Sequence, residues 1–168
     1  ILQKADKICI SLNDESLQAN VILAFGILEM QRANYNKAIN YFNAALPIFR
    51  VEDMKYQESF AELNKAEALL ELPVSEFPNG LDQAKRSVAN AKRIIAANNY
   101  IKLRAQSYKL TSQIAMREGN TDDAIRNFSL YSNLNDSINR VYTQAVSKGM
   151  DAETSIGDLT QIIENKQS

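Results

Sequence analysis

Histidine is absent from the 168-residue chain, and cysteine occurs only once, as Cys9. Without histidine the chain has no Ser-His or Cys-His nucleophile pair, no imidazole metal ligand and no side chain that ordinarily titrates near neutral pH. A single cysteine forms neither an intrachain disulfide nor a cysteine-based zinc site. Cys9 stands between Ile8 and Ile10, where a small buried hydrophobic residue is expected. These absences argue against an enzyme and against a metal or other cofactor.

Glycine (5) and proline (3) are scarce, and tryptophan is missing. A β-rich fold needs more turn residues, so the composition predicts helices. The glycines lie far apart, which excludes a phosphate-binding loop and a dinucleotide fingerprint. No apolar run approaches the roughly 18 residues of a membrane helix. The formal net charge of −1 gives the whole chain no attraction to nucleic acid or acidic lipid. We therefore expect neither nucleic acid nor membrane as a partner.

Three segments share a helical pattern of alanine, a large apolar residue four positions later, and a small or aromatic residue three positions beyond. The three sets are Ala38, Phe42 and Ala45; Ala84, Val88 and Ala91; and Ala124, Phe128 and Tyr131. On a helix these positions share one face. The alanine has no bulk, so it allows two helices to approach closely.

This pattern resembles the second helix of the tetratricopeptide repeat (TPR). Upstream, Ile22, Phe25 and Gly26 fit the first helix of such a repeat, while two other sets fit more loosely. Those sets are Leu63 with Ala66 and Tyr108 with Ser112. The resemblance implies an all-α superhelix of antiparallel helix pairs. The marker alanines are spaced more widely than the 34-residue standard, which indicates repeats of roughly 40 residues.

The pattern divides the chain into a repeat domain at residues 1–148 and a polar, acidic tail at residues 149–168. We expect the second helix of a truncated repeat over 1–13, then helix pairs at 16–33 with 36–51, 54–72 with 80–97, and 100–118 with 121–134, and a closing helix over 136–148. Asp136 would cap that closing helix. Residues 73–80 are expected to form a loop, and Gly119-Asn120 a turn. The tail holds one apolar patch, Leu159, Ile162 and Ile163, in either a short helix or irregular structure.

A second resemblance concerns Tyr131 to Ile138. This stretch is similar to the close of the repeat region in sensor histidine kinases and transcriptional regulators of Bacteroidetes-type bacteria, where it leads into a linking helix and an output module. The following residues, Val141 to Ser155, are neutral and contain Gly149, which departs from the charged helix usual there. The chain begins at Ile1 without a methionine or signal peptide, so we expect a piece of a longer protein, periplasmic or cytoplasmic.

The resemblance implies a partner-binding groove lined by the first helix of each pair. Carried over by alignment, its residues are Asn20, Leu23, Ile27 and Met30; Asn64, Ala68 and Glu71; and Lys109, Gln113 and Met116. The chaperone-binding subfamily grips a terminal carboxylate with Lys and Asn, but Leu23 and Ile27 stand at those places here. An apolar strip with amides suits an extended segment or an amphipathic helix. The alternative is that Leu23, Ile27 and Met30 only pack against a neighbouring helix.

A second candidate surface is a basic patch. Residues 83–117 contain no acid, and Lys85, Arg86, Lys92 and Arg93 repeat at a spacing of seven, so they form a stripe on one helix face. Either this is a solvated outer face partly neutralised by the acidic segment 52–76, or it binds an acidic protein or another domain. The stripe has no aromatic residue, which argues against nucleic acid.

Taken together, these features predict a non-catalytic module that binds a protein or peptide. Its context would be the sensory or regulatory part of a bacterial signalling protein, with its own downstream output module as one potential partner. The alternative is a free-standing scaffold that assembles other proteins. The oligomeric state and the identity of the ligand are not encoded in any motif, because repeat scaffolds share a frame and differ in a few side chains.

Overall fold

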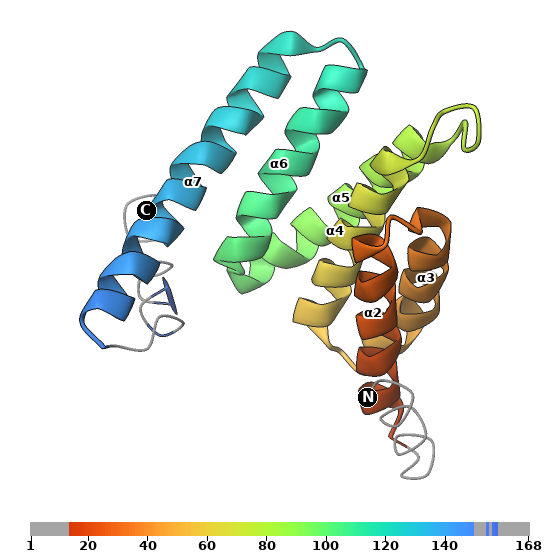
Figure 1. Cartoon of the computed structure of the whole chain (residues 1–168), viewed down its shortest axis with the longest axis horizontal. Helices are drawn as coiled ribbons and strands as arrows, with labels where there is room; N and C mark the ends of the chain where they lie inside the picture. The colour runs from red at the N-terminus through yellow and green to blue at the C-terminus, as the bar shows by residue number, and fades with distance from the viewer. Residues whose placement is uncertain (1–13, 150–153, 155, 158–168) are drawn as a thin grey trace. The chain divides into compact units, whose positions relative to one another are not determined.

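The computed structural model describes residues 14–149, 154, 156 and 157. Within this part of the chain every element is helical and no strand occurs (Figure 1). The helices are α2 (Glu15–Gln31), α3 (Tyr35–Val51), α4 (Lys55–Glu71), α5 (Gly80–Asn98), α6 (Ile101–Arg117) and α7 (Thr121–Ser147). The all-α prediction is confirmed, and most helix bounds agree with the expected ones to within two residues. The helix expected over 1–13, with Cys9, and the patch at Leu159, Ile162 and Ile163 lie outside the described residues.

None of the helices in the described part of the chain is both long and apolar enough to cross a membrane.

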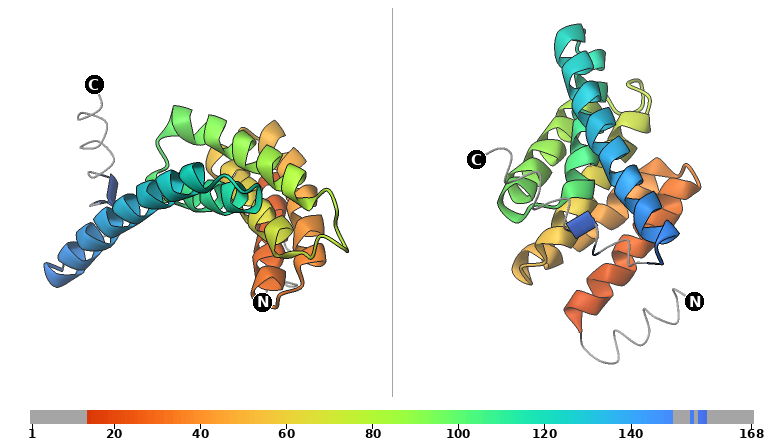
Figure 2. Two further views of the ribbon diagram at one scale, coloured as in Figure 1. Left: turned by 90° about the horizontal axis from the view of Figure 1, so that it is seen from above. Right: turned by 90° about the vertical axis from the view of Figure 1, so that its left-hand side faces the viewer.

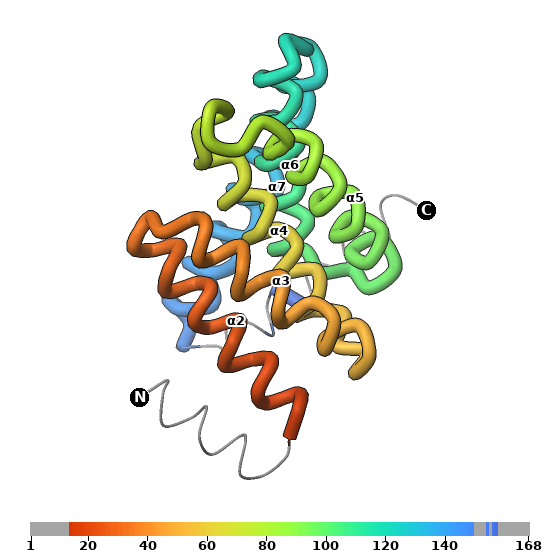
Figure 3. The backbone as a smooth tube through the Cα atoms, turned by 90° about the vertical axis from the view of Figure 1, so that its right-hand side faces the viewer, coloured from red at the N-terminus to blue at the C-terminus, as the bar shows by residue number. Residues whose placement is uncertain are grey.

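The chain forms two compact units, Ile1–Ile94 and Ile95–Ser168. In the first unit α2 pairs with α3, and α4 packs on α3 and also touches α2 (Figure 3). In the second unit α6 and α7 lie side by side, joined by a tight turn at Gly119 (Figure 1). Helix α5 begins at Gly80, after the loop that Pro73 and Pro78 were expected to make.

The core of the first unit is built on small residues at helix crossings. Its buried cluster consists of Ala19, Leu23, Ala38, Phe42, Ala45, Leu46, Phe49 and Ala61. Gly26 of α2 faces the Phe42 ring of α3 so closely that a Cβ there would lie 2.5 Å from the ring atom Cε1. The marker alanines Ala38, Ala84 and Ala124 are all buried, as the alignment predicts.

The turn between α2 and α3 is held by Glu29, which lies at the end of α2. Its carboxylate accepts hydrogen bonds from Asn34 Nδ2 at 2.8 Å and from the Arg32 guanidinium at 3.0 Å. These bonds, the Asn34 bond first, hold the pKa of Glu29 below its usual value despite partial burial. Ala33 takes the left-handed conformation that reverses the chain, at φ 58°.

A buried ion network links three helices of the first unit. Arg50 of α3 donates to Glu62 Oε1 at 2.7 Å and to Glu58 Oε1 at 3.1 Å, and both carboxylates belong to α4. Asn90 of α5 donates to the same Glu62 oxygen at 3.1 Å. The second oxygen of Glu62 has Lys65 Nζ at 3.3 Å but accepts no hydrogen bond within the described residues. Two acids of segment 52–76, Glu58 and Glu62, are therefore turned inward.

The second unit is held by a different set of contacts. The Ser112 hydroxyl of α6 donates to the Ala124 carbonyl of α7 at 2.8 Å in a buried hydrogen bond between the helices. A cluster of Ile101, Ala105, Ile138 and Ile156 closes the opposite end. Because Ile156 is buried in this cluster, the chain after Gly149 returns to pack on α6 and α7 at that residue.

Two expectations for α7 are wrong. The predicted break at Asp136 does not occur, because one helix of 27 residues runs from Thr121 to Ser147. The Ser137 hydroxyl donates to the Asn133 carbonyl one turn earlier, so this Asp-Ser pair lies within a helix instead of capping one. Phe128, expected to pack like Phe42, is 58% exposed, whereas Phe42 is fully buried.

Candidate partner-binding surfaces

The four groove residues predicted on α2 divide between core and surface. Leu23 belongs to the buried core cluster, and Ile27 and Met30 are partly buried and packed against it. Leu23 therefore packs within the fold, whereas Ile27 and Met30 keep part of their surface exposed. Asn20 is partly exposed, and its Nδ2 donates to the Ser16 carbonyl of its own helix at 3.0 Å.

On α4 the predicted positions are mostly closed. Ala68 is fully buried, and Asn64 is 8% exposed with its Nδ2 bonded to the Phe60 carbonyl at 2.8 Å. Only Glu71, at the end of the helix, is exposed. Ala68 is thus not a groove residue, and the Asn64 amide already uses one of its hydrogens within α4.

Sequence reasoning missed the accessible apolar residues of these two helices. Leu17 of α2 is 41% exposed and Tyr56 of α4 is 44% exposed. Tyr56 stacks on Phe60 with ring centroids 6.3 Å apart and planes 8° from parallel. The signal was present in the sequence, because aromatic residues at i and i+4 meet on one helix face.

These residues form what we call the α2–α4 face. It consists of Leu17, Asn20, Ala24, Ile27 and Gln31 on α2, and Tyr56, Phe60, Asn64, Glu67 and Glu71 on α4. Gly26 and Ala66 hold matching places in their repeats, and counted from them four of the five positions in each set match, beginning with Asn20 and Phe60. Leu17 matches Gln57, which is one residue after Tyr56. Helices α2 and α4, which carry the two sets, contact each other.

The positions predicted on α6 belong to the second unit. Gln113 and Met116 are exposed, Met116 by 62%, and Lys109 is partly exposed. Accessibility is what a binding role requires, and these three satisfy it. These three residues lie in the second unit, whereas the α2–α4 face lies in the first.

The basic stripe lies on α5. Lys85, Arg86 and Arg93 are exposed, whereas Lys92 is partly buried, and this burial lowers the pKa of its ammonium group. Burial of one of the four cations weakens the stripe as an electrostatic surface. A solvated outer face accounts for the other three.

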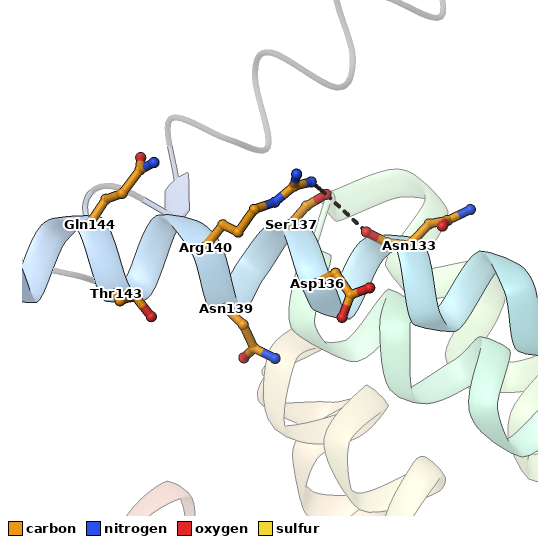
Figure 4. Close-up of a pocket in the computed structure, with 7 residues that line it drawn as sticks. All are labelled: Asn133, Asp136, Ser137, Asn139, Arg140, Thr143 and Gln144. Atoms are coloured by element: carbon orange, nitrogen blue, oxygen red, sulfur yellow. Dashed lines mark hydrogen bonds between the residues drawn. The ribbon is translucent and has the colours of Figure 1, made fainter.

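A hollow of about 910 Å³ lies along the C-terminal half of α7 (Figure 4). Its described lining comes from this helix alone: Asn133, Asp136, Ser137, Asn139, Arg140, Thr143 and Gln144. Arg140 donates to the Ser137 hydroxyl at 3.2 Å, so its guanidinium is engaged locally. Among the described residues, no group of three acidic or cysteine side chains converges to hold a metal ion.

Comparison of the chain with protein-family models, curated proteins and solved structures gave no match.

Proposed function

We propose that the chain is a non-catalytic TPR-like helical repeat module that binds an extended segment of another protein on its α2–α4 face. The observation that carries this proposal is the register of that face: two first helices in contact with each other carry sets of residues that match at four of five positions. An exposed apolar end, formed by Leu17 and Tyr56, is followed by amide and carboxylate groups.

The chemistry of the face suits a peptide in extended conformation. Such a peptide offers backbone N–H and C=O groups at short intervals and side chains that alternate in direction. Asn20, which is partly exposed, keeps an amide oxygen and one amide hydrogen beyond the bond to its own helix, whereas the Asn64 side chain is only 8% exposed. The Tyr56–Phe60 stack provides a flat apolar surface, and aromatic residues carry much of the energy in protein interfaces. Glu71, exposed at the end of α4, favours a basic residue toward the other end of the peptide.

The proposed context is the regulatory region of a bacterial signalling protein. Its support is the phrase Tyr131 to Ile138, which resembles the close of such repeat regions. Helix α7 continues through this phrase without a break, and a continuous helix is suited to transmit a change at the repeats to a following module. The reading frame of the gene distinguishes this context from a free-standing scaffold. A stop codon directly after Ser168 would favour the scaffold.

The first prediction concerns Leu17 and Tyr56. Tyr56→Ala and Leu17→Ala each weaken partner binding by about 30-fold, because these are the exposed large apolar side chains of the face and truncating an interface hot-spot residue typically costs about 2 kcal/mol. Both side chains are more than two-fifths exposed, so helix content and melting temperature change little. The measurement is capture of partners from an extract of the source cell, followed by titration of the captured protein.

Two controls accompany this experiment. Val51→Ala removes similar apolar surface from a residue that is 79% exposed and lies off the face, and it leaves binding intact. Reversal of Lys85, Arg86, Lys92 and Arg93 to glutamate has little effect if the stripe is a solvated face. Loss of the partner in the stripe variant, with full binding by Tyr56→Ala, would move the site to α5 and refute the proposal.

A further inference from the structure

One face of α7 is apolar at both ends and open to solvent. Ile125 and Phe128 near its start are 60% and 58% exposed, and Tyr142 and Val146 near its end are 53% and 58% exposed. Ser132, Asn135 and Asn139 lie between them on the same side of the helix. We call these seven residues the α7 stripe.

The repeat pattern shows what kind of element covers this face elsewhere in the chain. Counted from the marker alanines Ala38 and Ala124, the positions of Phe128, Ser132 and Asn135 match three residues of α3. Those are Phe42, Leu46 and Phe49, all buried in the cluster that contains Ala61 of α4. In the first unit this face receives α2, through Gly26 on Phe42, and also α4, whereas on α7 Phe128 is exposed and Ser132 and Asn135 are partly exposed. The occupant to expect is another helix.

The order of residues along the α7 stripe indicates which helix fits. Ile125 and Val146 lie ten residues before and eleven after Asn135, and Phe128 and Tyr142 lie seven residues on either side. The pattern thus reads apolar, polar, apolar almost identically in both directions. Two copies laid antiparallel place Ile125 against the other copy's Val146, and Phe128 against its Tyr142. A two-fold symmetric contact requires this self-complementarity.

Electrostatics permits the same pairing. The charged residues of the helix and its C-cap, Asp122, Asp123, Arg126, Asp136, Arg140 and Lys148, all lie off the α7 stripe by helical spacing. No charged residue belongs to the stripe itself, and the charge nearest its centre is Asp136, which follows Asn135. The polar residues Ser132, Asn135 and Asn139 face their counterparts near the two-fold axis, where amide and hydroxyl groups bond to one another.

We propose that α7 is a homodimerisation helix, which pairs antiparallel with α7 of a second copy through Ile125, Phe128, Tyr142 and Val146. The stripe runs from Ile125 to Val146, about 32 Å of helix. A single helix pair of that length buries less than the roughly 1,600 Å² of a standard specific interface. The dimer is accordingly weak, with a dissociation constant on the order of micromolar or above.

Sedimentation equilibrium of the whole 168-residue chain tests the pairing. Between low micromolar and millimolar concentrations the mass rises from one chain to two. Phe128→Asp places a charge in the seam and keeps the chain monomeric throughout. Leu130→Asp is the matched control: Leu130 is 43% exposed on the same helix but points about 200° away from Phe128, so the dimer persists. Circular dichroism confirms that both variants keep their helices.

A charge-exchange experiment tests the antiparallel register. Ile125→Lys alone and Val146→Glu alone each weaken self-association by about tenfold or more, because each buries a charge without a partner. Mixing the two variants restores association, since the ammonium group introduced at position 125 of one copy then meets the carboxylate introduced at position 146 of the other. A wild-type chain that stays monomeric at millimolar concentration overturns the proposal, and so does a Phe128→Asp variant that still dimerises. If the mixture of the Ile125→Lys and Val146→Glu variants fails to associate, the antiparallel register is excluded.

Discussion

At Gly26 the missing side chain sets how near α2 and α3 approach each other. The Phe42 ring occupies the space that a Cβ would need, and Phe42 itself is fully buried. Two effects compete when alanine replaces this glycine. Alanine favours the helix by up to about 1 kcal/mol. A contact of 2.5 Å against a ring confined in the core costs about 1–3 kcal/mol in overpacking.

The Gly26→Ala variant is therefore expected to be less stable than the wild-type chain. Urea denaturation should show a loss of about 1 kcal/mol in the free energy of unfolding, because overpacking exceeds the gain in helix propensity. In a Phe42→Leu background the ring is gone, and the same substitution becomes neutral or stabilising. An equal loss in both backgrounds would mean that the Phe42 ring does not limit this helix crossing.

At the scale of helices, buried charge selects which neighbours pair. Arg50 of α3 and Asn90 of α5 both reach the buried Glu62 of α4, so this carboxylate specifies its two neighbours. The interaction is asymmetric: the Glu62 side chain is fully buried, while that of Arg50 is 49% exposed. Removing the cation leaves a buried charge short of partners, whereas removing the anion leaves a cation that water can solvate.

The corresponding prediction is a double-mutant cycle. Arg50→Met destabilises the chain by about 3 kcal/mol, since it breaks a pair whose acid is buried, and Glu62→Met costs less. Combining the two recovers part of the loss, because the buried Glu62 carboxylate is gone, while Glu58 still lacks its bond from Arg50. Chemical denaturation of the four proteins gives the coupling energy. Strictly additive costs would show that Arg50 and Glu62 do not stabilise each other.

Helix α7 shows how far sequence reasoning reaches at this scale. The alternation of Ala124, Phe128 and Tyr131 predicted a helix correctly, because local periodicity decides helix formation. Asp136 suggested the start of a new helix, since aspartate is a good cap. The apolar residues Leu134, Ile138 and Val141 nevertheless continue the buried side of α7, which packs against α6 and Ile156. Packing along this buried side outweighs the local preference for a cap. Where a helix ends depends on neighbours that local motifs do not encode.

At the scale of the whole chain, composition and repeats predicted the fold class, while the binding surface was predicted only in part. The low glycine and proline content is a property of composition and can be read without knowing any tertiary contact. It correctly indicated helices without strands in the described residues. Which side of α2 and α4 is accessible depends on the angle at which helices cross. Leu23 was assigned to the groove but lies in the core, and Tyr56 was overlooked although it is exposed.

Figure 2 shows α7 continuing past the start of α6, a consequence of its 27 residues against the 17 of α6. The first unit carries the proposed peptide surface and the second carries the proposed pairing helix. The two proposed activities lie in separate units, so we expect substitutions to separate them. A chain with Phe128→Asp should be monomeric and still bind its partner, while a chain with Tyr56→Ala should dimerise and bind poorly.

Site-specific photocrosslinking tests the central claim, binding on the α2–α4 face, most directly. A benzophenone amino acid replaces either Tyr56 or Tyr142, two exposed tyrosines of similar accessibility, with little disturbance of the fold. After irradiation in an extract of the source cell, mass spectrometry identifies what each position has captured. We predict that position 56 crosslinks to a segment of another protein and that position 142 crosslinks to a second copy of the chain. Capture of the partner protein at position 142, with none at position 56, would contradict the account.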